Sequence, residues 1–446
     1  MQHHPFFEHS VVSGPVVPRH CPNGLPGLIR DVAISRPMAI AASDDVCDLT
    51  YQELEVWSDT VARALRAAAP PEVPVIVAFP RSIELVVALL AILKAGLPYL
   101  TVDPASPHQQ VHRIVQEAGS TLALVGQHVR QVTATQGLST IEIDALRPVT
   151  TNTDLDQLPA VQAAQAVYAL FTPGPTGALH GVLLPSQALC NRLLWMRETY
   201  GAGAEDRILQ ASSITCEAST WELWLPLISG GTCVFLTPEA HPSPATVTRV
   251  IIERQITMCC FMPPMLAEFL SRPEAAQCSS LRHVFYRGGT LSAAASHRFA
   301  STLWARLHGL SGVAEAAGDI THWSHPDLAD TVDPLSPASV ALAPVSRARP
   351  IDNCVMAVLG ANGLPVPLGQ EGELHIGGLP LALGYLHRPD LTTEAFVNGV
   401  SGSPAPRWYR TGDRVRLLNG ELEYLGRIND SSTSPTEERV VRTQLV

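Results

Sequence analysis

The chain has 446 residues, of which 46% are hydrophobic and only 16% are charged, whereas about 25% charged residues is usual. It is therefore long and apolar enough for two or three domains with sizeable cores. The formal net charge of -11 argues against a nucleic-acid surface or an anionic membrane as partner, because both attract proteins with an excess of lysine and arginine.

The cysteines and the N-terminal residues indicate the compartment. Nine cysteines occur without a Cys-x-x-Cys pair, which favours buried apolar thiols in a reducing cytoplasm over disulfides or zinc. Residues 1–10 are rich in histidine and lack the basic and then apolar order of a signal peptide. The longest apolar run, residues 85–93, has about half the roughly 20 residues needed to span a bilayer. We expect a cytoplasmic protein.

The first part of the chain alternates between strand and helix patterns. Residues 1–24 have no apolar periodicity and are interpreted as a linker or leader. Residues 49–69 predict an amphipathic helix, which begins at a capping box formed by Thr50 and Glu53. The elements expected next are a strand at 73–79, a helix at 82–95, a strand at 99–102, a helix at 108–118 and a strand at 121–125. This alternation predicts a parallel, doubly wound sheet in a first α/β subdomain at 25–155.

The pattern repeats in a second α/β subdomain, which we expect at 156–343 after a polar linker near 147–160. Its expected elements are helices at 187–200, 244–254 and 265–270, and strands at 208–211, 232–236, 258–261 and 284–286. From residue 344 short strands separated by glycine-rich turns predict a small β-barrel or sandwich at 344–430. Residues 431–446 are polar and are interpreted as a tail.

A loop of small residues at 172–177 lies between two apolar, strand-like runs. Loops of this kind bind phosphates, because glycine lets backbone N–H groups turn toward an anion and threonine hydroxyls add donors. Pro173 and Pro175, however, have no N–H to donate. His180 stands just before Gly181, where a phosphate-binding lysine is expected. The loop therefore has the outline of an ATP site but lacks several of its donors.

From about residue 25 to 430 the chain resembles the large N-terminal part of the adenylation domains of nonribosomal peptide synthetases, which belong to the adenylate-forming ligases. The stretches that carry the resemblance are LTYQEL at 49–54, LKAGLPY at 93–99, the loop at 172–181, CEASTWE at 216–222, EAA at 315–317, DITHW at 319–323, GELHIGG at 372–378, GYL at 384–386, YRTGD at 409–413 and GRIN at 426–429. Their order and spacing make chance similarity very improbable.

The resemblance implies a reaction and its cofactors. Members of this family activate an amino acid with ATP and Mg²⁺ to an aminoacyl adenylate and load it onto a carrier-protein thiol. By resemblance, Glu315 matches the magnesium ligand, a hard carboxylate suited to that ion. Asp413 matches the acid that holds the ribose hydroxyls, and Arg427 the basic residue that closes over the nucleotide. A turn-capping role for Asp413 and a salt-bridge role for Arg427 are alternatives.

The resemblance also implies two sets of site residues. The nucleotide set comprises Thr172, Gly174, Thr176, Gly177, His180, Gly288, Gly289, Ser311, Ala314, Asp413 and Arg427. The amino-acid pocket comprises Glu217, Ala218, Trp221, Phe261, Phe285, Arg287, Leu310, Gly318 and Asp319. The expected partners are neighbouring condensation or cyclisation domains, carrier domains and a small helper protein.

Several positions depart from the family pattern at the nucleotide. Ser311 replaces an aromatic residue and cannot stack on adenine. Ala314 replaces a threonine and cannot donate a hydroxyl to the α-phosphate. The Gly-Gly-Glu-Ala turn becomes Arg-Gly-Gly-Thr at 287–290, which removes the acid. Asn429 replaces the aspartate at the hinge, and the C-terminal lobe with its lysine does not follow.

The amino-acid pocket departs as well. Glu217 replaces the aspartate that pairs with the substrate ammonium and reaches one methylene further. A buried arginine needs an acid or an anion, so we expect Arg287 to pair with Glu217 or Asp319 and plug the pocket. The side chains expected to line the pocket, either as core or against a substrate, are Trp221, Phe261, Phe285 and Leu310.

Two hypotheses follow. In the first, the chain is a degenerate adenylation domain with little or no activity, kept as a structural platform for neighbouring synthetase domains. In the second, it is an active or conditionally active ligase with an unusual substrate, completed by a C-terminal lobe that is missing or supplied in trans. An acyl-activating enzyme of the wider family is a third option, disfavoured because Glu217 and Trp221 keep the amino-acid-type pattern.

Overall fold

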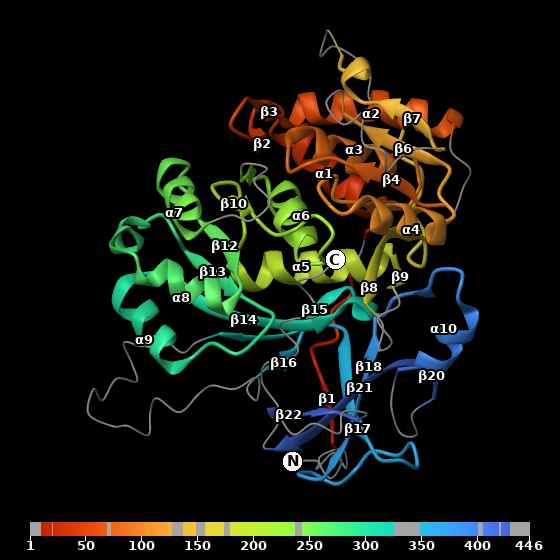
Figure 1. Ribbon diagram of the computed structural model, residues 1–446, viewed down its shortest axis with the longest axis vertical. Coiled ribbons are helices and arrows are strands. Elements are labelled where there is room, and N and C mark those ends of the chain that lie inside the picture. Colours follow the sequence, from red (N-terminus) through yellow and green to blue (C-terminus); the bar gives the residue numbers. More distant parts are fainter. Residues whose placement is uncertain are drawn as a thin grey trace.

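The computed structural model describes residues 10–19, 21–68, 73–126, 137–148, 157–173, 179–236, 243–324, 348–399, 405–418 and 421–428. Within these residues the strands form three sheets of seven, nine and six strands, with helices packed against the first two (Figure 1). The predicted α/β class with two doubly wound layers is confirmed. None of the helices in these ranges is long and apolar enough to cross a bilayer.

The first sheet has a parallel centre and antiparallel strands at one edge. Its strand order is β19 (Gly384–Tyr385), β9 (Leu179–Pro185), β8 (Ala166–Pro173), β5 (Tyr99–Thr101), β4 (Val75–Ala78), β6 (Leu122–Val125) and β7 (Ser139–Glu142). Its helices are α2 (Tyr51–Ala68), α3 (Ile83–Lys94) and α4 (His108–Ala118). The strands from β8 to β7 pair in parallel, while β9 turns back beside β8 as a hairpin.

The second sheet is also parallel at its centre. Its order is β16 (Arg349–Pro350), β15 (Gly318–Ser324), β14 (Arg306–Val313), β13 (His283–Tyr286), β12 (Met258–Phe261), β10 (Arg207–Gln210), β11 (Thr232–Phe235), β2 (Ile40–Ser43) and β3 (Asp48–Thr50). The accompanying helices are α1 (Gly24–Ser35), α5 (Ser186–Tyr200), α6 (Ser219–Ser229), α7 (Pro244–Glu253), α8 (Pro263–Ser271) and α9 (Ala293–Thr302).

The third sheet is antiparallel. Its strands are β1 (Val11–Ser13), β17 (Cys354–Leu359), β18 (Glu371–Gly378), β21 (Arg407–Leu418), β20 (Phe396–Asn398) and β22 (Glu421–Arg427), and α10 (Pro389–Ala395) lies beside β20. Strands β20 and β22 pair with different parts of β21, so the described pairing is open at β1 and at these two strands.

The sheets do not coincide with the sequence ranges expected for the subdomains. Strands β2 and β3 come from the first range but lie at the edge of the second sheet, where Ala42 pairs with Cys233. Strand β19 comes from the third range but pairs with β9 in the first sheet. Strand β1 comes from the predicted leader and pairs with β17. The three parts of the fold are therefore joined by exchanged strands, and domain boundaries as such remain a prediction.

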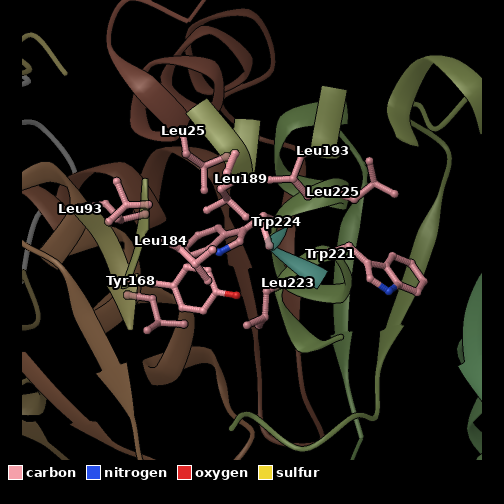
Figure 2. Packing of buried hydrophobic residues seen from close by; sticks show 14 of the residues in the cluster. Leu25, Leu93, Tyr168, Leu184, Leu189, Leu193, Trp221, Leu223, Trp224 and Leu225 are labelled. Carbon is pink, nitrogen blue, oxygen red and sulfur yellow. The ribbon is translucent and has the colours of Figure 1, made fainter. Parts of the chain in front are cut away.

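Local sequence explains where the helices begin and what they bury. The predicted capping box is present at α2, since the Thr50 N–H donates to Glu53 Oε2 at 2.8 Å and the Glu53 N–H donates to Thr50 Oγ1 at 3.2 Å. Helix α3 is buried along its whole length, as expected for an apolar run too short for a membrane. Leucines of α5 and α6 meet Tyr168 of β8 and Leu184 of β9 in the main core (Figure 2). Helix α5 is thus packed against elements of both large sheets.

Three buried charges and one partly buried arginine lie between α1, α2 and α3. Lys94 is fully buried, and its Nζ lies 2.9 Å from Glu55 Oε2 and 2.7 Å from Asp59 Oδ1. Arg30 donates to the same two carboxylates, with Nε 2.7 Å from Glu55 Oε2 and Nη2 2.7 Å from Asp59 Oδ1. The two cations and two anions balance, which makes the burial of Lys94, Glu55 and Asp59 tolerable.

Replacing Lys94 tests this network. The substitution Lys94→Met leaves one buried carboxylate uncompensated, so we expect a loss of about 3–5 kcal/mol in the free energy of unfolding, measured by urea denaturation. Arg113→Met, at the exposed pair with Glu117, is the matched control and should change stability by less than about 0.5 kcal/mol. A Lys94→Met variant as stable as this control would contradict the role of the network.

Candidate functional site

Arg287 is the centre of the candidate site. It follows β13 directly and pairs with two carboxylates: its Nη2 contacts Glu217 Oε1, and its Nε lies 3.3 Å from Asp319 Oδ1. Its Nη1 also donates to Cys216 Sγ at 3.3 Å. The side chains of Arg287 and Glu217 are only 11% and 10% exposed. The ion pair expected between Arg287 and these acids is therefore present, and the guanidinium points inward.

A second arginine completes the group. Arg192 of α5 is 1% exposed, and its Nη2 contacts Asp319 Oδ2. Its Nη1 donates to the carbonyl oxygens of Ala317 and Glu217 at 3.0 and 3.2 Å, and to Thr220 Oγ1 at 3.1 Å. We call Arg192, Asp319, Arg287 and Glu217 the ion-pair cluster. Its two positive and two negative charges cancel, so every member has its counter-charge within the chain.

Arg192 is absent from the predicted site. One signal in the sequence could have indicated it, because Arg192 is a cation inside the apolar stretch ALCNRLLWM at 188–196. A charge on the buried face of a helix requires a buried partner. Nothing in the sequence says which acid that partner is, since Asp319 lies 127 residues further along the chain.

The cluster governs the protonation of its members. Burial alone would raise the pKa of Glu217, but the charge and hydrogen bond of Arg287 outweigh it and lower that pKa to about 2. Burial would likewise lower the pKa of Arg287, yet Glu217 and Asp319 hold it well above its usual range. Burial and the neighbouring Glu217 raise the pKa of the Cys216 thiol to about 12. At neutral pH Glu217 and Arg287 are thus charged and Cys216 is a thiol.

Backbone geometry fits the cluster closely. Gly318, at the start of β15, has a φ of +94°, a conformation that favours glycine. A Cβ at Gly318 would lie 2.5 Å from Arg192 Nη1 and 3.1 Å from Glu217 Cγ. The residue before it, Ala317, has a φ of +57° in the turn between β14 and β15. This turn brings Asp319 under α5, and only glycine leaves room there for the guanidinium of Arg192.

Two of the side chains predicted to line the pocket are in direct contact. Trp221 of α6 packs against Phe285 of β13, with ring centroids 5.0 Å apart, and Leu310 of β14 belongs to the same core cluster. All three are buried, and Ala218, the N-cap residue of α6, is buried as well. These side chains are therefore part of the main core.

Phe261 does not lie with these residues. Its ring stacks on Phe269, 5.0 Å away, in a second core cluster that also contains Tyr286. Successive side chains of a strand point to opposite faces, so the residue of β12 on the Phe285 side is its register partner Cys260. The prediction was one residue off, because a buried parallel strand is apolar on both faces and its pattern does not reveal which side faces the pocket.

Two residues expected at the nucleotide contact each other. Arg427 Nη1 lies 2.9 Å from Asp413 Oδ1 and donates to the Thr411 carbonyl oxygen at 2.7 Å. Asp413 is 2% exposed, while the side chain of Arg427 is 43% exposed. The Asp413 N–H donates to Thr411 Oγ1 at 3.0 Å. The salt bridge raised as an alternative for Arg427 is therefore present, while the side chain that caps this turn is that of Thr411 and not that of Asp413.

Glu315 is held by a tyrosine that the sequence did not indicate. Tyr385 of β19 donates its hydroxyl to Glu315 Oε1 at 2.8 Å. Burial raises the pKa of Glu315, although the tyrosine hydrogen bond opposes this. The ring of His180 lies 5.7 Å from that of Tyr385, and burial lowers the pKa of His180. The β8–β9 hairpin and Glu315 are thus neighbours through Tyr385.

The remaining predicted residues are placed as follows. Thr172 lies opposite His180 in the β8–β9 hairpin. Gly288 and Gly289 follow Arg287, and Gly288 has a φ of +79°. Ser311 of β14 accepts a hydrogen bond on its carbonyl oxygen from Thr321 Oγ1 at 3.2 Å, and Ala314 is buried. Predicted site residues outside the described ranges are Gly174, Thr176, Gly177 and Asn429.

A magnesium ion would find few ligands from the protein. Across the described ranges, no three histidine, cysteine, aspartate or glutamate side chains are arranged to hold a metal. Glu315 offers a single carboxylate, and Tyr385 already donates to it. Mg²⁺ prefers six oxygen ligands, so it would depend on ATP phosphates and water for the others. One carboxylate together with phosphate and water oxygens is a common ligand set for Mg²⁺, so Glu315 is compatible with this ion when a nucleotide supplies the phosphates.

Comparison with known proteins identifies relatives. A family model described as AMP-binding enzyme matches residues 29–386. Over 421 residues the chain is 34% identical to tyrocidine synthase 3 of Brevibacillus parabrevis. This match covers 94% of this chain and 6% of that protein. It is 36% identical over 411 residues to phosphinothricin tripeptide synthetase PhsB of Streptomyces viridochromogenes, covering 91% of this chain and 34% of PhsB.

A solved structure agrees with these relatives. The nonribosomal peptide synthetase FmoA3 in its AMPPNP-bound form superposes with a TM-score of 0.81 at 26% identity, covering 94% of this chain and 43% of that chain. The chain thus spans less than half the length of each of these three similar proteins.

Breaking the ion-pair cluster should change the pH dependence of stability. The depressed pKa of Glu217 stabilises the fold above its ordinary pKa of 4.5, and this contribution is lost as the pH falls from 4.5 to about 2. Arg287→Met removes the guanidinium and leaves Glu217 buried and unpaired. We expect a cost of about 3 kcal/mol at pH 7 that shrinks toward pH 4, measured by urea unfolding.

Two further variants make this test specific. Arg287→Met with Glu217→Gln removes both charges and should recover part of the loss. Arg249→Met, at an exposed pair, should leave stability nearly unchanged at every pH. A cost for Arg287→Met that is the same at pH 4 and pH 7 would refute the charge-based explanation.

Proposed function

Since the chain belongs to the AMP-binding enzyme family, as an adenylation domain of the nonribosomal peptide synthetase type, we propose that it is a degenerate member that keeps the fold as a structural platform and has little or no adenylating activity. Its relatives are multidomain synthetases, of which this chain matches one part. The proposed partners are therefore the condensation or cyclisation and carrier domains that neighbour such a domain.

The ion-pair cluster is the observation that carries this proposal. An amino-acid substrate brings an ammonium group that needs a free buried carboxylate. The carboxylate of Glu217 is already bound by Arg287, and Asp319 is bound by both arginines. A guanidinium on the same chain costs no translational entropy to bind, whereas an incoming ammonium does. An amino acid would have to displace a neutral, hydrogen-bonded group to bind.

The residues around the expected nucleotide support the same proposal. Catalysis of adenylation rests on positioning the polyphosphate and offsetting its charge. Ser311 offers no aromatic face where the family has an aromatic residue, and Ala314 offers no hydroxyl where the family has a threonine. Burial lowers the pKa of His180, so at neutral pH it is a poor substitute for a cationic lysine. The missing side-chain groups would thus weaken the binding of both substrates, ATP and the amino acid.

A second candidate function is an adenylating ligase with an unusual substrate. It is favoured by the retention of Glu315, Asp413 and Arg427, which are the residue types that the family uses at the metal and the nucleotide. Such an enzyme would take a C-terminal lobe from a longer chain or from a partner. It would also need a substrate whose chemistry tolerates Arg287 beside Glu217.

Nucleotide binding separates the two candidates. We expect titration calorimetry with ATP and Mg²⁺ to give no binding heat below millimolar ATP, because the aromatic and hydroxyl contacts are missing. The double variant Ser311→Tyr with Ala314→Thr restores both side-chain types and should gain measurable affinity. Micromolar affinity of the unaltered protein for ATP would overturn the proposed degeneration.

Activity requires a second measurement. We expect no amino-acid-dependent exchange of pyrophosphate into ATP by a chain extended past Val446 with a C-terminal lobe, tested with all common amino acids. An Arg287→Ala variant of the same chain frees Glu217 and serves as the matched comparison. Exchange by the unaltered chain with any amino acid would exclude the platform proposal and favour the second candidate.

A further inference from the structure

Two histidines lie side by side on the solvent face of α4. His108 is the first residue of this helix, and His112 follows it one turn later. Both histidines are exposed, whereas Val111, Ile114 and Val115 are buried in the core beside the first sheet. The apolar face of α4 therefore holds the helix in place, and the opposite face presents the two histidines to solvent.

The imidazole rings of His108 and His112 are neighbours. Their centroids lie 6.2 Å apart, and their planes differ by only 10°. This spacing follows from the helix, because residues i and i+4 lie one above the other on its surface. Within the described ranges, neither ring makes a hydrogen bond or an ion pair with another side chain or with the backbone. No protein group in these ranges therefore competes with a ligand for the ring nitrogens.

We propose that His108 and His112 form a chelating site for a divalent transition-metal ion of the class of Zn²⁺. Imidazole nitrogen suits Zn²⁺, Ni²⁺ and Cu²⁺, whereas Mg²⁺ and Ca²⁺ prefer oxygen ligands. The proposal does not depend on the proposed function, because both histidines lie outside the ion-pair cluster and the expected nucleotide site.

Coordination requires only a rotation of the two side chains. Both rings are exposed, so rotation about their side-chain bonds breaks no packing. One nitrogen of each ring can then approach the ion to about 2.0–2.1 Å, the usual distance between zinc and imidazole nitrogen. The protein supplies two ligands, which agrees with the absence of a group of three ligating side chains in the described ranges. Water completes the coordination, so the ion binds reversibly at the surface.

The charges near the pair do not oppose a bound cation. Arg113 is the next residue after His112, and its Nε lies 2.8 Å from Glu117 Oε1, so its positive charge is offset. The chain as a whole has a net charge of -11, which attracts cations to its surface. The field around α4 is therefore compatible with binding of a divalent ion.

Two imidazoles on one folded helix bind an ion more tightly than a single imidazole does. Once one ring has bound, the other is held nearby at a high effective concentration. Loss of either histidine should therefore weaken the binding of Zn²⁺ by at least about tenfold. The unfolded chain does not maintain the spacing of the two rings, so this site binds the ion only in the folded protein.

The test uses Zn²⁺ as the probe and diethyl pyrocarbonate, which modifies accessible imidazoles, as the reagent. Mass spectrometry gives the modification rate of each histidine in the unaltered protein, and Zn²⁺ should slow the modification of His108 and His112. His297 of α9 is the internal control, because it is exposed but has no histidine one turn away, and its rate should not change. Equal protection of all three histidines, or no protection of His108 and His112, would refute the site.

Two variants test whether the rings act together. In His112→Ala, protection of His108 should require at least about ten times more Zn²⁺ than in the unaltered protein. The double variant His112→Gln with Gln109→His keeps two histidines, but at adjacent positions that do not face each other, and should lose protection of His108 to the same extent. All these positions are exposed, so the fold should be retained. Protection of His108 at an unchanged Zn²⁺ concentration in either variant would contradict chelation by the pair.

Discussion

The structure depends on one constraint, which is that two buried arginines must each find an acid inside the protein. Arg192 comes from α5, Arg287 follows β13, and the acids Glu217 and Asp319 come from the segment before α6 and from β15. No two of these residues are close in sequence, so four separate elements must be in place before the charges balance. Removing one partner would leave a charge in a medium that solvates it poorly. The cluster therefore ties the turn at Gly318 to the packing of α5 and α6.

The fold could be predicted to a large extent, because its signals are local. The capping box at Thr50 and Glu53, the apolar run that became α3 and the alternation of strands and helices each need only a few neighbouring residues. The exchanged strands were not predictable in this way. Nothing in residues 40–50 indicates that β2 pairs with β11 of the other sheet, because a strand pattern does not name its partner.

The site was predictable in part. A resemblance over many motifs located Arg287 and Glu217, and the rule that a buried charge needs a partner supplied the pairing. Arg192 and Tyr385 were missed because their roles come from contacts with distant residues, Asp319 and Glu315. Phe261 was misplaced because strand β12 is apolar on both faces, so only the three-dimensional arrangement shows that Cys260 faces the cluster. Sequence patterns thus gave the types of residue, and tertiary contacts decided which of them meet.

The exchanged strands also affect the order in which the protein can fold. Strands β2 and β3 complete the second sheet only when β11 has been made, about 190 residues later, as the pairing of Ala42 with Cys233 requires. Strand β19 joins the first sheet from still further along, since Tyr385 pairs with Val182. The first sheet cannot be completed while its own part of the chain is being synthesised, and β2 and β3 lack their partner strand until β11 has been made. Contacts between residues so far apart in sequence slow folding. Until the partner strand has been synthesised, the edges of the earlier strands remain unpaired. A chain that leaves the ribosome can therefore complete its first sheet only after residues 384–385 have been made, when most of the second sheet has already been synthesised.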